Sequence, residues 1–96
     1  MRKYEVMYII RPTVELEAKK AMIEELNLIL TTRGSEAIKV NEWGTREFAY
    51  EIDDLRKGYY VVLEGMMTVE GVNELDRVCR IKEDIIRHII INREEL

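Results

Sequence analysis

The side chains best suited to acid–base or nucleophilic chemistry are few and isolated in this sequence. His88 is the only histidine, and no cysteine or carboxylate stands near it at a spacing typical of metal ligands. Cys79 is the only cysteine, and no histidine lies close enough in the sequence to activate its thiol. We therefore expect a structural or surface role for His88 and a small buried side chain for Cys79.

Recognisable catalytic motifs are also missing. The sequence contains no glycine-rich phosphate loop, nucleophile elbow or zinc-protease motif. The carboxylates between residues 15 and 25 fall opposite an apolar helical stripe, which is typical of a solvated face. We predict that the chain is not an enzyme and that it uses no metal and no cofactor.

The stretch 42–50 (EWGTREFAY) has the least ordinary composition in the chain. It places Trp43, Arg46 and Phe48 around Gly44, where the alternation of a strand is interrupted and a bulge is expected. One interpretation is a bulge with Trp43 covering the edge of a sheet. The other is an aromatic and arginine surface of the kind enriched at protein interfaces. The sequence leaves both open, including the face that Trp43 occupies.

Residues 57–63 (KGYYVVL) begin like the third strand of an RNA-recognition motif, whose consensus is K/R-G-F/Y-G/A-F-V-x-F/Y. The first three positions match. Tyr60 replaces a small residue and Val61 replaces a stacking aromatic, while the first strand offers Met7 and Ile9. Because base stacking requires aromatic rings, we favour a coincidental strand over a stacking platform.

Hydrophobic periodicity predicts four strands and two helices. We expect strands at Lys3–Ile10, Ala37–Ile52, Tyr59–Met67 and Ile85–Asn92, and helices near Val14–Thr32 and Val69–Ile81. This order, with right-handed crossovers, predicts an α+β fold of the ferredoxin-like split βαβ type (βαββαβ). Such a fold has a four-stranded antiparallel sheet with two helices on one face. The nearly all-apolar last strand is expected to be central or covered on both faces.

Local signals mark the ends of these elements. Thr13 and Thr68 are expected to cap the two helices, Gly34 to follow the first helix, and residues 53–58 to form a polar hairpin loop. Gly65 leaves a gap on the core side of the third strand that the sequence does not explain. Gly71 weakens the second helix by about 1 kcal/mol relative to alanine.

Two helices can cover only one side of this sheet, so the other side is expected to expose Met, Ile, Val and Tyr. An exposed apolar patch on a soluble domain usually marks a docking surface. The 96 residues form a single domain, 1–96, and the net charge of −4 argues against binding nucleic acid by bulk charge alone. No signal peptide or membrane-length apolar run occurs, and we expect a cytoplasmic protein.

Several colinear segments resemble one family. They are residues 1–12 (MRKYEVMYIIRP), Trp43-Gly44 with Arg46 and residues 48–50 (FAY), residues 57–60 (KGYY) and residues 85–88 (IIRH). Over nearly its whole length the chain resembles the bacterial small-subunit ribosomal protein six family.

The resemblance implies a ferredoxin-like, non-enzymatic structural constituent of the small ribosomal subunit. Such proteins bind the central domain of 16S ribosomal RNA as a heterodimer with small-subunit ribosomal protein eighteen, a basic partner that suits an acidic module. No membrane and no small-molecule substrate is implied. The alternative is a ferredoxin-like regulatory or scaffold domain that dimerises through its open sheet face, and a third reading is a stand-alone RNA-recognition motif.

Candidate site residues follow from the predicted surface and the resemblance. The RNA-binding set is expected at neighbouring ends of the first and last strands, although the alternation also allows a core position for Tyr4. It comprises Arg2, Lys3, Tyr4, Arg87 and Arg93. The protein-partner set comprises Trp43, Arg46, Phe48, Tyr50 and Tyr60.

Overall fold

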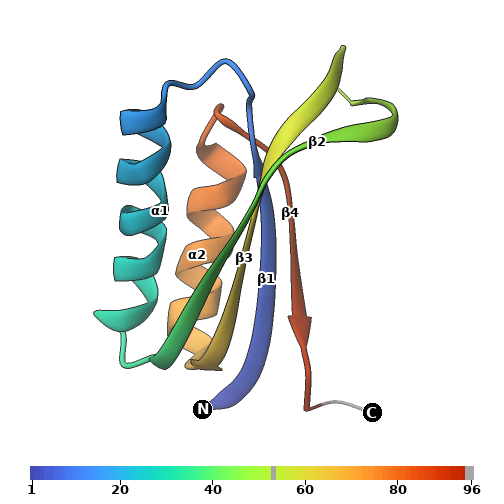
Figure 1. The fold of residues 1–96 in the computed structure, drawn as a ribbon. Coiled ribbons are helices and arrows are strands. Elements are labelled where there is room, and N and C mark those ends of the chain that lie inside the picture. The colour runs from blue at the N-terminus through green and yellow to red at the C-terminus, as the bar shows by residue number, and fades with distance from the viewer. Residues whose placement is uncertain (53, 95–96) are drawn as a thin grey trace.

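The computed structural model describes residues 1–52 and 54–94. Its elements are β1 (Arg2–Ile10), α1 (Leu16–Thr31), β2 (Glu36–Ile52), β3 (Leu55–Met67), α2 (Val69–Ile81) and β4 (Ile85–Asn92). The strands form one antiparallel sheet in the order β2-β3-β1-β4. Both helices lie on the same side of the sheet (Figure 1). The ferredoxin-like fold predicted from the sequence is confirmed.

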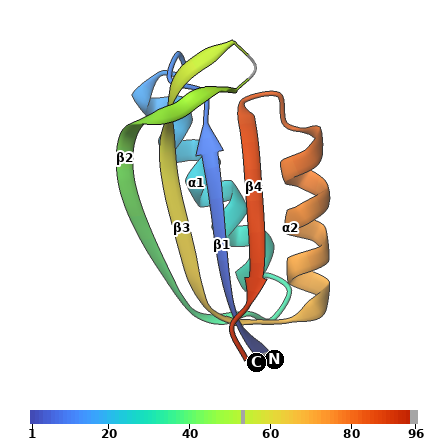
Figure 2. The same ribbon diagram turned by 90° about the vertical axis from the view of Figure 1, so that its right-hand side faces the viewer.

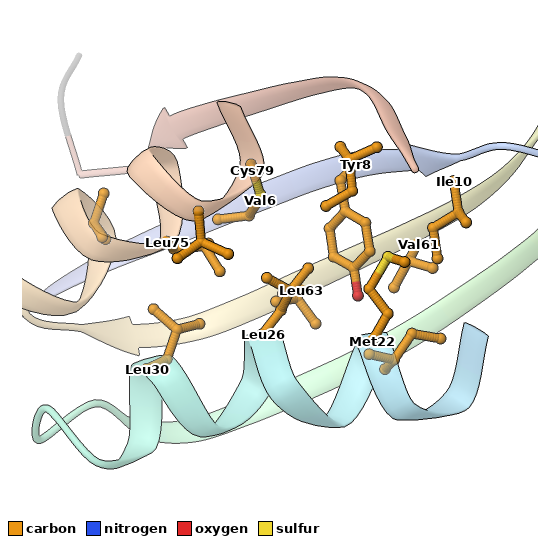
Figure 3. Close-up of a cluster of buried hydrophobic side chains, with 14 of the residues drawn as sticks. Val6, Tyr8, Ile10, Met22, Leu26, Leu30, Val61, Leu63, Leu75 and Cys79 are labelled. Atoms are coloured by element: carbon orange, nitrogen blue, oxygen red, sulfur yellow. The ribbon is translucent and has the colours of Figure 1, made fainter. Parts of the chain in front are cut away.

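The hydrophobic core lies between the sheet and the helices, as the alternation of β1 predicts. Val6 pairs with Leu63 and Tyr8 with Val61, and all four side chains are fully buried. Leu26 of α1 packs against them from the helix layer (Figure 3). The hydroxyl of Tyr8 finds no hydrogen-bond partner among the described residues, and burial raises its pKa.

The two candidate reactive side chains have the structural environments expected of them. Cys79 is buried in the core, and burial raises the pKa of its thiol to about 12, so the nucleophilic thiolate is absent at neutral pH. His88 projects from β4 toward α2, where its Nε2 lies 2.7 Å from Oδ1 of Asp76. Asp76 also binds Arg80 one turn further along α2. Among the described residues, no group of three His, Cys, Asp or Glu side chains could hold a metal ion.

Stability is expected to depend on pH through Asp76. The hydrogen bond with His88, and then the contact with Arg80, hold the pKa of the Asp76 carboxyl below its usual range. Because the pKa of Asp76 is lower in the folded state than in the unfolded state, its ionised carboxylate stabilises the folded protein at any pH above the unfolded-state pKa. This stabilisation is lost as the pH falls through the folded-state pKa. We expect Asp76→Asn to lower the free energy of unfolding by ~1 kcal/mol at pH 7. Urea unfolding from pH 7 to pH 2 should show the difference shrinking below about pH 4. A difference of constant size would contradict this assignment.

A hydrogen-bonded junction joins the end of α1 to the start of α2. The hydroxyl of Thr68 accepts from the backbone N–H of Gly71 at 3.0 Å and donates to the carbonyl of Arg33 at 2.8 Å. The backbone N–H of Thr68 donates to the buried hydroxyl of Ser35 at 3.1 Å. The predicted Thr68 cap is therefore confirmed. The predicted Thr13 cap is wrong, because α1 begins after Glu15, whose side chain makes no capping hydrogen bond.

Close packing explains the two glycines that look unusual in the sequence. A Cβ on Gly65 would lie 2.7 Å from the carbonyl oxygen of Ala37, so the backbone of β2 occupies the space of a side chain. A Cβ on Gly71 would lie 3.0 Å from Oγ1 of Thr68 and 3.1 Å from Oγ of Ser35. Gly71 thus leaves space for the side chains of Thr68 and Ser35. The hydrogen bonds of the junction offset the low helix propensity of glycine.

Two other expectations about the strands are wrong. Leu55 to Gly58 belong to β3 rather than to a loop, because β2 and β3 continue to the pair Ile52 and Leu55. Asp53 lies outside the described residues. The last strand, β4, is at an edge of the sheet beside β1, with its neighbours shown in Figure 2. Its second apolar face is not covered by the described residues, and Ile89 is 49% exposed there.

No helix among the described residues is long and apolar enough to cross a bilayer. The other local predictions hold. Gly34 follows α1 with a positive φ of 88°, and Gly44 stands at a break in the pairing of β2 with β3.

Candidate RNA and protein interface

We define the open face as the side of the sheet away from the helices. Glu5, Met7 and Ile9 of β1 lie on it, because their neighbours Val6 and Tyr8 point into the core. Their cross-strand partners lie there too, namely Glu64, Val62 and Tyr60 on β3 and Ile91, Ile89 and Arg87 on β4. The predicted apolar side of the sheet is therefore present.

Two apolar side chains in the middle of this face are almost completely buried. Ile9 and Val62 are each only 5% exposed. Exposed apolar side chains remain on either side of them, with Trp43 on β2 and Ile89 and Ile91 on β4. A partner would thus meet two apolar areas rather than one continuous patch.

Trp43, Arg46, Phe48 and Tyr60 form one group, which we call the aromatic cluster. The rings of Trp43 and Tyr60 are stacked, with centroids 6.3 Å apart. Phe48 meets Tyr60 edge-on at 6.2 Å. The guanidinium of Arg46 lies 5.3 Å from the Trp43 ring centroid, close enough for a cation–π contact. Four of the five predicted partner residues are thus joined in one chain of contacts, from Arg46 through Trp43 and Tyr60 to Phe48.

Tyr50 stands apart from that cluster. It is 77% exposed and lines a hollow with Phe48, Ile52 and Tyr60 on the β2–β3 hairpin. The hairpin extends past the body of the sheet in Figure 1. Tyr50 therefore borders the aromatic cluster from the projecting part of the hairpin.

Two glycines allow the aromatic cluster to form. Gly44 has a positive φ of 83° at the bulge beside Trp43, a conformation that glycine adopts without strain. At Gly58, a Cβ would lie 2.9 Å from Cζ of Phe48 and 2.4 Å from Cγ2 of Ile9. The missing side chain lets Phe48 lie across the sheet. Sequence reasoning predicted the bulge at Gly44 but missed this role of Gly58, since it depends on a residue ten positions away.

Three of the five predicted RNA-binding residues lie at the end of the sheet where β1 begins and β4 ends. The backbone N–H of Arg93 donates to the carbonyl of Lys3 at 2.8 Å, and Arg2 is the next residue along β1. The guanidinium of Arg93 also pairs with Glu5 at 2.9 Å. We call Arg2, Lys3 and Arg93 the basic end; all three are exposed.

Arg87 and Tyr4 are placed differently. Arg87 pairs with Ile9, whereas Asn92 pairs with Tyr4, so Arg87 is about 17 Å along β4 from the basic end. The expectation of neighbouring strand ends is wrong for Arg87, because it lies near the start of β4, beside the end of β1. Tyr4 faces the helices and packs partly against the core, although it also lines a hollow with Lys3 and Arg93.

A charged row crosses the open face between these areas, and no local pattern in the sequence indicated it. Glu5 and Glu64 are direct cross-strand partners. The side-chain amide of Asn41 donates to Oε1 of Glu64 at 3.4 Å, and Nζ of Lys39 lies 4.0 Å from the same oxygen. The row contains residues from β1, β2, β3 and the segment after β4. These residues become neighbours only when the strands pair in the register of the folded sheet.

A ferredoxin-like sheet with a basic end and a separate aromatic cluster defines an α+β binding domain with more than one contact surface. Comparisons with known proteins give the family. A family model described as ribosomal protein S6 matches residues 3–92. The chain is also similar to the crystal structure of 30S ribosomal protein S6 from Thermotoga maritima, with 33% sequence identity and a TM-score of 0.90. That match covers 96% of this chain and 87% of the other. The chain therefore belongs to the ribosomal protein S6 family and is a ribosomal protein of the small subunit.

Proposed function

We propose that this protein binds the central domain of 16S ribosomal RNA together with small-subunit ribosomal protein eighteen (S18), as a structural component of the small subunit in the cytoplasm. The basic end would contact RNA phosphates through Arg2, Lys3 and Arg93. The aromatic cluster, with Tyr50, would contact S18. Arg87 and Tyr4 complete the proposed RNA-binding set, Arg87 from the far end of β4.

The observation that carries this proposal is the separation of the two surfaces on one sheet. The basic end lies where β1 starts, whereas the aromatic cluster gathers around Tyr60, which pairs with Ile9 near the end of β1. RNA and protein can therefore be held at once without competing for the same side chains. Family membership supports the same assignment.

Charge also favours this arrangement. Across the helices and the turn that follows α2, residues 14–31 and 69–84 carry nine acidic and five basic side chains, a net −4 that equals the charge of the whole chain. The remaining residues, including the whole sheet, are neutral in sum. A polyanion is thus repelled by the helix layer and meets its phosphate contacts on the strands.

The experiment is an RNA-binding titration of the heterodimer with S18 on a central-domain 16S RNA fragment, over a range of salt concentrations. We expect Arg2→Ala, Arg93→Ala and Arg87→Ala each to lower affinity and to reduce the slope of log K against log salt by about one unit. Lys20→Ala, on the exposed surface of α1, is the matched control and should leave the slope unchanged. An unchanged affinity and slope for Arg87→Ala would remove that residue from the RNA site.

The alternative, a scaffold domain that dimerises through the open face, makes a different prediction. The free chain would sediment as a dimer at micromolar concentration, and Ile89→Lys would dissociate it. The proposed function expects a monomer that forms a one-to-one complex with S18. A dimer that persists in the presence of S18 would favour the alternative.

A further inference from the structure

The two edges of the sheet are built differently. The pairing of β2 with β3 shifts register in three places, and exposed charged side chains recur along β2. Bulges and charges of this kind protect an edge strand against pairing with other chains. In contrast, β4 pairs with β1 in unbroken register from Arg87 to Asn92. Ile89, Ile90 and Ile91 run through its middle, so β4 lacks the protection that β2 has.

The free backbone groups of β4 can be assigned from one hydrogen bond. The N–H of Arg93 points toward β1, where it meets the carbonyl of Lys3. In an antiparallel ladder, inward and outward backbone groups alternate along the strand. The N–H and C=O groups of residues 88, 90 and 92 therefore point outward. Among residues 1–52 and 54–94, no backbone hydrogen bond reaches them from another element.

The side chains beside this edge form an ordered pattern on the open face. Ile91 and Ile89 are 39% and 49% exposed, and Arg93 and Arg87 stand on either side of them. Arg93 shares its charge with Glu5, whereas Arg87 makes no ion pair with any described residue. On the opposite face, the contact of His88 with Asp76 of α2 holds the strand against the helix layer.

We propose that the outer edge of β4 is a docking site for an extended segment of a protein partner, added to the sheet as a fifth strand. Backbone hydrogen bonds to residues 88, 90 and 92 would supply affinity, and alternate side chains would supply specificity. Opposite Arg93, Ile91, Ile89 and Arg87, the segment carries acidic, apolar, apolar and acidic side chains in turn. This site uses no residue of the aromatic cluster, but it shares Arg87 and Arg93 with the proposed RNA-binding set, so the segment and RNA would compete for these two side chains.

A second copy of this chain fits the edge less well. The antiparallel register that pairs all the outward residues places residue 90 on the symmetry axis. Arg87 then faces Arg93 of the second copy, and like charges directly opposed across a ladder are destabilising. Two copies of β4 could also pair in a shifted antiparallel register, which avoids that contact. Residue 88 or residue 92 of one copy then faces a residue of the other copy that lies outside the regularly paired stretch 87–92. Charge complementarity therefore favours an acidic-ended segment over self-pairing.

The test uses two synthetic peptides and the full chain. One has the sequence Glu-Thr-Val-Thr-Val-Thr-Glu, and its control has lysine in place of both glutamates. We expect the acidic peptide to bind at least ~10-fold more tightly and to slow hydrogen exchange of the amides of residues 88, 90 and 92. Equal binding of the two peptides, or binding without protection of these amides, would overturn the proposal.

Two variants test the geometry. Ile90→Pro removes an outward N–H and leaves the ladder with β1 intact, so it should abolish binding of the acidic peptide. Arg87→Glu should reverse the preference between the two peptides, and it keeps the test valid if Ile90→Pro does not fold. A wild-type preference in Arg87→Glu would overturn the proposal. Sedimentation of the free chain as a dimer that Ile90→Pro dissociates would assign the edge to a second copy instead.

Discussion

Replacing Gly58 by alanine is expected to disrupt the aromatic cluster. The new methyl group would overlap Cγ2 of Ile9 and Cζ of Phe48, at 2.4 Å and 2.9 Å. Both side chains must therefore shift: Ile9 within its buried site, and Phe48 away from its position beside Tyr60. We expect a loss of about 1–3 kcal/mol in the free energy of unfolding, as for other overpacked sites. Affinity for S18 should fall at least ~10-fold, because aromatic side chains in the proposed interface carry much of the binding energy and Phe48 would be displaced.

A double variant separates the two effects. In Gly58→Ala combined with Phe48→Leu, the smaller side chain relieves the overlap with residue 48 but not the overlap with Ile9, so only part of the lost stability should return. The aromatic contact with Tyr60 stays absent, and S18 affinity should remain low. Chemical denaturation and calorimetric titration measure the two quantities. Wild-type stability and affinity in Gly58→Ala would show that Phe48 does not need this space.

Replacing Thr68 by valine should produce the second large effect. Valine preserves the shape of the side chain but removes the hydroxyl, so the N–H of Gly71 and the carbonyl of Arg33 lose their partner. An N-cap loss typically costs ~1 kcal/mol, and an unsatisfied part-buried group costs a similar amount. We therefore expect the free energy of unfolding to fall by about 2–3 kcal/mol.

The control for this variant is Thr68→Ser, which keeps the hydroxyl and should stay within ~0.5 kcal/mol of wild type. Urea denaturation should show a lower midpoint for Thr68→Val with an unchanged slope, since the surface exposed on unfolding is the same. Equal midpoints for the valine and serine variants would contradict the role of the junction.

The sequence predicted the fold well because its signals were local and periodic. Alternation in residues 3–10 puts Val6 and Tyr8 on one face of a strand, and the four-residue spacing of Leu26 and Leu30 puts them on one stripe of a helix; the structure buries all four together. The Thr68 cap was predictable for the same reason. The Thr13 cap failed, since the chain after Pro12 makes a further turn before α1 begins and Val14 bonds back to Arg11.

The site was less predictable because it depends on register and on close packing between distant residues. An apolar strand suggested a central position for β4, but strand order is set by the crossovers and not by composition. Arg87 looked like a neighbour of Arg2 until the antiparallel pairing placed it opposite Ile9. The close approach of Ala37 to Gly65 likewise requires a backbone shift in β2 that no local pattern announces.

The stacking of Trp43 on Tyr60 gives this protein an internal fluorescent reporter. Trp43 is the only tryptophan, and half of its surface meets solvent. A protein partner bound over the aromatic cluster would exclude water from the indole of Trp43 and shift its emission to shorter wavelength. RNA held at the basic end would leave the emission spectrum nearly unchanged. The order in which protein and RNA join the subunit could then be followed in real time, without attaching a dye.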